Sequence, residues 1–404
     1  MFTCQNCGDC CRGAWLIGVD DASHAALKDV VGAEKFTRLP LPLASGERVT
    51  LARAPSGACV FLSDDHRCGI HNDLGYAAKP QVCREFPYHF VETPDGIATG
   101  LSFACTAVLN HRGVPLAHQT DAVAAVVAGS VRVAKLPDPI VLYSGVDIGW
   151  EQYRLIEGAL LAILGDDAIA FPRALLAGSL LVTLAVSLAR LEQQGSSAGR
   201  TLAGGLEELA GNHYRPLVDV AVRVPVPTRG SLTHLAPLYT WLQFSRAKTS
   251  RFGLVWALYG NYLRFRRRAG RLPDLVSGLG SFDIAAVTQV RFKGDDPAVA
   301  GFLREYWRHV VVRKTLTPMH GVFRGYHTML TLYAFMTWSA KLRAHREGRG
   351  ETTLEDARDA VRLVEQHVVL HAQFARLFEL SPVLTVLVDR LHRERGFVPR
   401  AVLS

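Results

Sequence analysis

The chain begins with four cysteines in the segment CQNCGDCC: Cys4, Cys7, Cys10 and Cys11. Four more follow, Cys59, Cys68, Cys83 and Cys105, and the remaining 299 residues contain none. An even number of thiols in one segment indicates either a disulfide framework or thiolate ligation of a metal. CxxC spacing lets successive thiolates converge on one ion or cluster. We therefore predict that the eight cysteines bind a metal, either as single ions such as zinc or as a cluster.

The adjacent pair Cys10 and Cys11 departs from the bacterial ferredoxin pattern, which has a three-residue gap and a Cys-Pro at this point. Adjacent side chains diverge in an extended backbone, so we expect that these two cysteines do not ligate the same atom. Two arrangements stay open: two separate four-ligand sites, or one site with spare cysteines. Gly8 and Gly13 suit a tight ligand loop, because glycine tolerates positive φ angles.

Other polar residues lie among the thiols. Histidines could replace a thiolate, but eight thiolates suffice, so we interpret these as partly exposed loop residues: His66, His71 and His89. Arg84, beside Cys83, could offset thiolate charge, or pair with Glu85 or Asp65. His367 and His371 are four residues apart, but the glutamate of an HExxH metalloprotease is absent, which favours a packed histidine pair.

The order of these motifs is specific: CxxCxxCC, then CVFL with CGIH nine residues on, then CREFP, then LSFAC. It resembles the YkgJ-type cysteine-cluster family of zinc- or iron-chelating domains, and within it the flagellin lysine N-methylase branch. In that branch a helical region follows the cysteine domain, and segments 147–164 and 302–314 are similar to parts of it. The resemblance implies a protein that binds an iron-sulfur cluster, with [4Fe–4S] as the preferred type, or another metal such as zinc through the cysteines. It also implies methyl transfer from S-adenosylmethionine to a lysine of flagellin or another protein.

Independent signs of methyl transfer are weak. The glycine-rich segments 202–209 and 276–283 do not follow a convincing strand, so S-adenosylmethionine would bind without the sheet-based fingerprint, at or near the metal. Lysine methylation needs a neutral amine, which a nearby carboxylate or tyrosine can provide. The sequence offers several without ranking them: Tyr76, Tyr88, Tyr153, Glu157 and Tyr306. The alternatives are a non-catalytic zinc or iron module and a redox or electron-transfer iron-sulfur protein.

The elements that must carry these residues are mainly helical. We predict a small irregular cysteine-rich domain over residues 1–120 and a large, mainly α-helical domain over residues 121–404. Helical spacing predicts a helix from an N-cap at Asp147 to Gly165, and a buried helix over 325–343. Thr352 and Glu355 form a capping box ahead of another long helix.

The apolar run 174–189 is shorter than the roughly 18 residues of a membrane span and contains Gly and Ser, so we predict a buried core helix and no membrane insertion. The first twenty residues lack the apolar region of a secretory signal. We therefore expect a cytoplasmic protein, and the reducing cytosol disfavours disulfides.

The formal net charge is +8, and it is unevenly placed. Residues 1–120 hold 10 Lys and Arg against 12 Asp and Glu, so the remaining chain carries +10. Such a surplus attracts nucleic acid, anionic small molecules or acidic proteins. It includes five arginines between Tyr262 and Arg271. We interpret this run as a solvated helix end rather than a nucleic-acid site, because no aromatic-rich platform or reading motif accompanies it; docking of an acidic protein is a further use.

Overall fold

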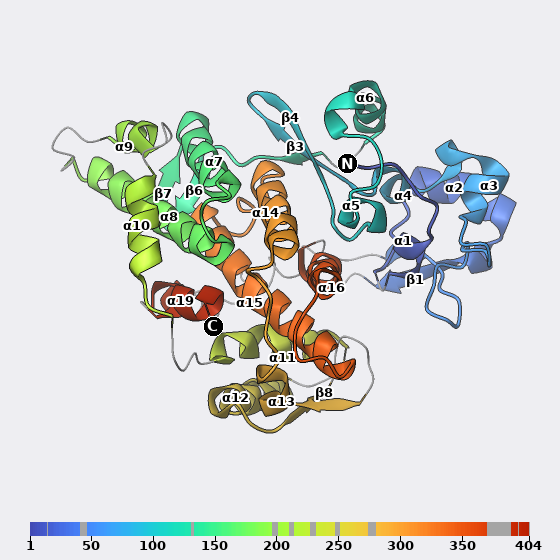
Figure 1. Cartoon of the computed structure of the whole chain (residues 1–404). Helices are drawn as coiled ribbons and strands as arrows, with labels where there is room; N and C mark the ends of the chain where they lie inside the picture. Colours follow the sequence, from blue (N-terminus) through green and yellow to red (C-terminus); the bar gives the residue numbers. More distant parts are fainter. Residues whose placement is uncertain are drawn as a thin grey trace. The chain divides into compact units, whose positions relative to one another are not determined.

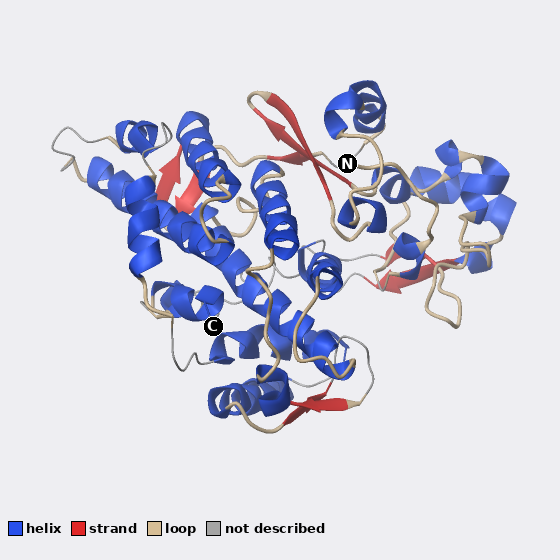
Figure 2. Cartoon of the chain, viewed as in Figure 1, coloured by secondary structure: helices blue, strands red, loops and turns tan. Residues whose placement is uncertain are grey.

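The structure is a computed structural model of the 404-residue chain. It describes all residues except 14, 41–46, 131–132, 196–200, 210–213, 227–231, 247–250, 274–279, 370–388, 395 and 404. Helices dominate, and strands form only small sheets (Figures 1 and 2), which confirms the predicted mainly α fold class. The chain divides into two compact units, Met1–Lys135 with Glu365–His371, and Leu136–Val364 with Ala372–Ser404.

The first unit consists of short helices and strands joined by loops. Its helices are α1 (Asp9–Arg12), α2 (Asp21–Val31), η1 (Ala33–Lys35), α3 (Gly69–Leu74), η2 (Tyr76–Ala78), α4 (Gln81–Glu85), α5 (Thr106–Leu109), η3 (Leu116–His118) and α6 (Thr120–Ala128). Its strands are β1 (Phe36–Pro40), β2 (Glu47–Leu51), β3 (Tyr88–Thr93), β4 (Gly96–Leu101) and β5 (Ala134–Lys135). β1 and β2 pair antiparallel, and β3 lies between antiparallel β4 and parallel β5.

A returning segment completes this unit. The π-helix η6 (Glu365–Val369) brings in Glu365, whose carboxylate is fully buried. Its Oε2 accepts hydrogen bonds from Ser102 Oγ at 3.0 Å and from the backbone N–H of Phe103 at 3.2 Å. A buried carboxylate needs such donors, so Glu365 ties the segment to the stretch that leads into Cys105.

The second unit is a helical assembly. Its helices are α7 (Trp150–Gly165), α8 (Phe171–Gln193), α9 (Leu202–Glu208), α10 (Arg215–Arg223), η5 (Leu232–His234), α11 (Leu235–Arg246), α12 (Arg251–Arg267), α13 (Ile284–Thr288), α14 (Pro297–Val312), α15 (Val322–Arg346), α16 (Leu354–Val364) and α19 (Phe397–Leu403). Two antiparallel hairpins accompany them, β6 (Ile140–Tyr143) with β7 (Val146–Ile148), and β8 (Arg271–Pro273) with β9 (Ser281–Asp283).

Helix α15 forms the centre of the second unit. It is 25 residues long and buried nearly all round, as the sequence predicted, and it packs against α8, α16 and α19 (Figure 1). Helix α8 has 23 residues and is therefore longer than the apolar run within it. By length and composition α8 could cross a membrane, but 61% of its most apolar window is buried inside the structure, as in a core helix.

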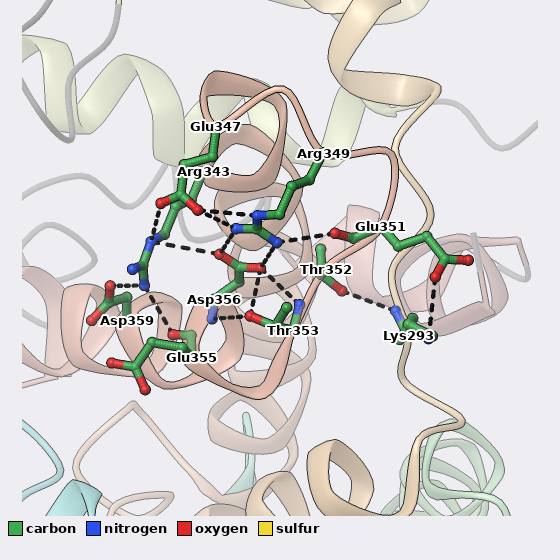
Figure 3. A network of polar contacts seen from close by, with 10 residues as sticks. All are labelled: Lys293, Arg343, Glu347, Arg349, Glu351, Thr352, Thr353, Glu355, Asp356 and Asp359. Carbon is green, nitrogen blue, oxygen red and sulfur yellow. Dashed lines mark hydrogen bonds and ion pairs between the residues drawn. The ribbon is translucent and has the colours of Figure 1, made fainter.

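Two predicted helix starts are wrong. Asp147 is not an N-cap, because it lies on β7; α7 starts after Gly149, whose N–H is capped by the side chain of Gln152. The capping box of α16 lies one residue later than predicted, since Thr353 and Asp356 exchange the reciprocal hydrogen bonds (Figure 3). The predicted long helix beyond Val369, with His371, falls outside the described residues.

Candidate metal centre

The first cysteine run wraps around one short helix. Gly8 has φ +70° and precedes α1, which carries Cys10 and Cys11. A Cβ at Gly8 would lie 2.9 Å from the carbonyl oxygen of His66 and 2.9 Å from a methyl carbon of Leu62. Both the backbone angle and the close approach require glycine. The glycine expected from the sequence thus lets the loop before Cys68 lie directly against α1.

Because α1 is helical, the adjacent thiols do not diverge as they would in an extended strand. The Sγ atoms of Cys10 and Cys11 lie 4.0 Å apart. Zinc–sulfur bonds of about 2.3 Å at tetrahedral angles place two sulfurs about 3.8 Å apart. The terminal thiolates of a [4Fe–4S] cluster sit on different irons and are more widely spaced. The separation therefore fits two ligands of one tetrahedral ion.

Cys59 joins this pair. It is 3% exposed, and its N–H donates to the carbonyl oxygen of Cys11 at 2.8 Å. A hydrogen bond with the Cys11 thiol lowers the pKa of Cys10 to about 7, and the corresponding bond lowers the pKa of Cys59 to about 7. The Cys11 thiol has a raised pKa because of its interactions with these two cysteines. The contacts thus favour the thiolate, the form that binds metal, at Cys10 and Cys59.

Cys83 packs against the same small core as Cys11 and Cys59, which contains Ile17, Val19 and Leu51. Burial raises the pKa of Cys83 to about 12 and that of Cys105 to about 11. The negative charge of the Cys10 thiolate also raises the pKa of both thiols. Buried thiols of this kind give up their protons to a metal, so binding should release protons.

The remaining cysteines have fewer interactions with the group formed by Cys10, Cys11 and Cys59. Burial raises the pKa of Cys7, whose thiol interacts with Thr106. Cys68 acts on Cys83 through its charge, and Cys4 is exposed with its Sγ 3.6 Å from Asn6 Oδ1. All eight cysteines are free thiols.

Among the described residues, no group of three or more His, Cys, Asp or Glu side chains is arranged to hold an ion. Thiolates are suitable ligands for zinc and for iron, and the sulfur of Cys11 interacts with those of Cys10 and Cys59. Closing a full ligand shell requires further thiols to move toward this group.

The nearby histidines have other neighbours. The side chain of His66 contacts that of Arg12, and the ring of His71 lies 5.6 Å from that of Tyr76. Only His66 lies in a turn, since His71 is on α3 and His89 is on β3.

Two cations act on the thiols, Arg53 on Cys59 and Lys79 on Cys10 and Cys83. The sequence reasoning missed both. The positive charge of Lys79 lowers the pKa of Cys10 and opposes the effect of burial on Cys83. Its Nζ lies 5.2 Å from the ring centroid of Tyr76. The expected partners of Arg84 are engaged elsewhere: Glu85 accepts from Gln81 and Ser130, and Asp65 pairs with Arg67. The only signal for Lys79 is its place four residues before Cys83, just ahead of α4.

Two residues offered for lysine chemistry, Tyr153 and Glu157, surround a lysine of the chain itself. Lys314 Nζ donates to the two carboxylate oxygens of Glu157 at 2.5 and 2.6 Å. It also lies 5.5 and 5.6 Å from the ring centroids of Trp150 and Tyr153. Burial raises the pKa of Glu157, against the opposing effect of Lys314. These groups form an internal ion pair.

Comparison with known proteins identifies the cysteine-rich part. Residues 3–105 match the family model described as "CxxCxxCC: Putative zinc- or iron-chelating domain". The match contains all eight cysteines, and the helical unit lies outside it. No curated protein and no solved structure matches the chain. The comparisons thus support zinc or iron chelation by the cysteine cluster and do not extend to a methylase branch.

Proposed function

We propose that the chain is a metal-binding module in which Cys10, Cys11, Cys59 and Cys83 hold one zinc or iron ion. The observation that carries this proposal is the contact of the Cys11 thiol with both Cys10 and Cys59, with the first two Sγ atoms 4.0 Å apart. The family model for zinc- or iron-chelating domains supports the same reading. Cys83 is included because it packs against the core that contains Cys59.

The metal would also stabilise the first unit. Its helices and strands are mostly short, and the four proposed ligands come from segments far apart in the sequence, from α1 to α4. An ion that joins α1, the Cys59 turn and α4 replaces packing that such short elements cannot provide, so metal binding contributes to folding. The free thiols suit the cytoplasm, where we expect the protein to work.

The experiment is anaerobic purification, followed by an absorption spectrum and elemental analysis of zinc, iron and acid-labile sulfide. A colourless protein with one zinc per chain, or one with iron and no sulfide, would support the single-ion module. A brown protein with similar amounts of iron and sulfide would show that the cysteines hold an iron-sulfur cluster and not a single ion. A folded first unit without any metal would contradict the proposal.

A finer hypothesis rests on the order of the cysteine motifs together with segments 147–164 and 302–314, which resemble the flagellin lysine N-methylase branch. It assigns to the protein methyl transfer from S-adenosylmethionine to a lysine of flagellin or another protein. Incubation of metal-loaded protein with S-adenosylmethionine and flagellin, followed by mass spectrometry, tests it. A substrate of unchanged mass would count against methyl transfer and leave the metal module intact. A cluster spectrum that changes reversibly with potential, without methyl transfer, would instead indicate electron transfer.

A further inference from the structure

Helix α12 exposes aromatic side chains to solvent. Trp256 is 73% exposed, Tyr259 55% and Tyr262 40%. The rings of Trp256 and Tyr259 contact each other edge to face, with centroids 6.5 Å apart. Large aromatic side chains exposed together are uncommon on a monomer surface and mark interaction sites. This cluster accompanies the arginine run, for which the sequence had suggested no aromatic platform.

The opposite face of α12 is fixed in the second unit. Phe265 is fully buried, with its ring 5.8 Å from that of Tyr239 and 5.7 Å from that of Trp338. Asn261 is 1% exposed and donates to Thr240 Oγ1 at 2.9 Å. At 3.6 residues per turn, Trp256 and Tyr259 lie about a third to half a turn away from Asn261 and Phe265, and Arg266 lies within about 20° of Tyr259 around the helix axis. The aromatic face therefore points outward because the helix is anchored on its other side, beside α11 (Figure 1).

Arginines complete this outward face. Arg266 and Arg267 are exposed and form no hydrogen bond or ion pair with any residue that the structure describes. The stretch 251–273 contains six arginines and no Asp or Glu. Unpaired cations next to exposed aromatic rings are complementary to a partner that offers both carboxylates and apolar side chains. Trp, Tyr and Arg are also the residue types enriched in the energetic centres of protein interfaces.

We propose that this α12 surface, formed by Trp256, Tyr259, Tyr262, Arg266 and Arg267, docks an acidic segment of a partner protein. A membrane-binding helix carries an apolar face with cations on the polar side, whereas here Arg266 lies between the aromatic residues on one face. Single-stranded nucleic acid is bound in positively charged grooves that follow the backbone, whereas these cations are concentrated in the last turn of one helix. An acidic peptide needs neither insertion nor a groove.

The test measures binding to the full-length, metal-loaded protein by fluorescence anisotropy. The probes are a labelled acidic peptide of glutamate and leucine, a labelled oligothymidylate, and vesicles of phosphatidylserine and phosphatidylcholine. We expect the peptide to bind, to weaken with added salt, and to change Trp256 fluorescence. The double variants Trp256→Ala/Tyr259→Ala and Arg266→Glu/Arg267→Glu should each reduce peptide affinity about tenfold or more.

The matched control is Arg223→Glu/Arg308→Glu, which reverses the charge of two exposed arginines on other helices, α10 and α14. It should bind the peptide as the unaltered protein does, and unchanged circular dichroism would show that all variants fold. If the control variant loses as much peptide affinity as the α12 variants, binding depends on net charge alone, and the proposal is overturned. So would absence of peptide binding, or an α12-dependent affinity for the oligonucleotide or vesicles that exceeds that for the peptide.

Discussion

The Sγ atoms of Cys10 and Cys11 lie 4.0 Å apart on a single turn of α1, a separation that suits two ligands of the same ion. If both bind it, Cys10→Ser and Cys11→Ser should each lower zinc affinity more than about 100-fold, because even residues that only orient a ligand contribute about 10- to 100-fold. Competition with a chromophoric chelator measures this affinity.

The exposed Cys4 provides the matched control for that pair. Cys4→Ser should keep the metal content and affinity of the unaltered protein, since its thiol lies outside the proposed ligand set. If Cys11→Ser binds zinc as tightly as the unaltered protein, Cys11 is not a ligand. The sequence-based expectation that Cys10 and Cys11 do not bind the same atom would then hold. Loss of metal in Cys4→Ser would mean that the ligand set is wrong, although the protein would remain metal-binding.

The sequence predicted the class of fold and the concentration of metal-ligand chemistry in the first 105 residues, because residue type and spacing carry that information directly. It did not predict the close approach of Cys10 and Cys11, since this depends on a single helical turn started by Gly8. Lys79 was missed because a cation is placed near thiols by packing rather than by a motif. The exposed face of α12 became visible only once Asn261 and Phe265 were seen to be buried.

The carboxylate of Asp356 organises the junction between α15 and α16 (Figure 3). Its side chain is completely buried and accepts two hydrogen bonds of 2.7 Å from Arg349, plus one of 2.7 Å from the N–H of Thr353. Burial opposes its ionisation, but these donors outweigh burial and keep the pKa of Asp356 below its ordinary value. Asp356→Asn removes the buried anion that Arg349 and Arg343 share and leaves them only the half-exposed Glu347 in common. It should lower the free energy of unfolding by about 3 kcal/mol.

Urea denaturation measures the free energy of unfolding of Asp356→Asn, and Glu355→Gln is the control variant. Glu355 is the 55% exposed neighbour of Asp356, and its ion pair with Arg358 spans 3.6 Å. Exposed pairs contribute little, so Glu355→Gln should change stability by less than about 1 kcal/mol. Similar small losses in both variants would show that the network adds no net stability.

Buried His327 should make the second unit sensitive to acid. Its Nδ1 donates to the carbonyl oxygen of Phe323 at 2.8 Å, and its Nε2 lies 3.0 Å from Ser179 Oγ. Burial lowers the pKa of His327 to about 4. The neighbouring ring of His392 also has a lowered pKa, owing to burial and to the charges of His327 and Arg324, which is itself paired with Asp389.

Between the ordinary histidine pKa of about 6.5 and the folded value, the unfolded chain binds more protons, so stability falls as pH falls through this window. We expect a loss of about 1 kcal/mol per pH unit from His327, measured as urea midpoints at several pH values. His327→Gln should flatten this slope, whereas His345→Gln, on the same helix, should not. An unchanged slope in His327→Gln would assign the acid sensitivity to other groups.

Variants of the buried pair Lys314 and Glu157 can distinguish the contribution of charge to stability from that of packing. Their side chains are only 8% and 12% exposed, so removing one charge leaves the other buried without a counter-ion. Glu157→Gln should therefore cost about 3–5 kcal/mol of unfolding free energy. Lys314→Met alone should also destabilise, because it leaves the carboxylate unpaired.

The double variant Glu157→Gln/Lys314→Met removes both charges and keeps the side-chain volumes. Since a neutral pair pays no desolvation penalty, we expect it to recover most of the stability lost in Glu157→Gln, as a positive coupling in the double-mutant cycle. Additive losses would indicate instead that contacts of Lys314 with the rings of Trp150 and Tyr153 carry the stabilisation. In that case Lys314→Arg, which retains a cation beside the rings, should be less destabilising than Lys314→Met.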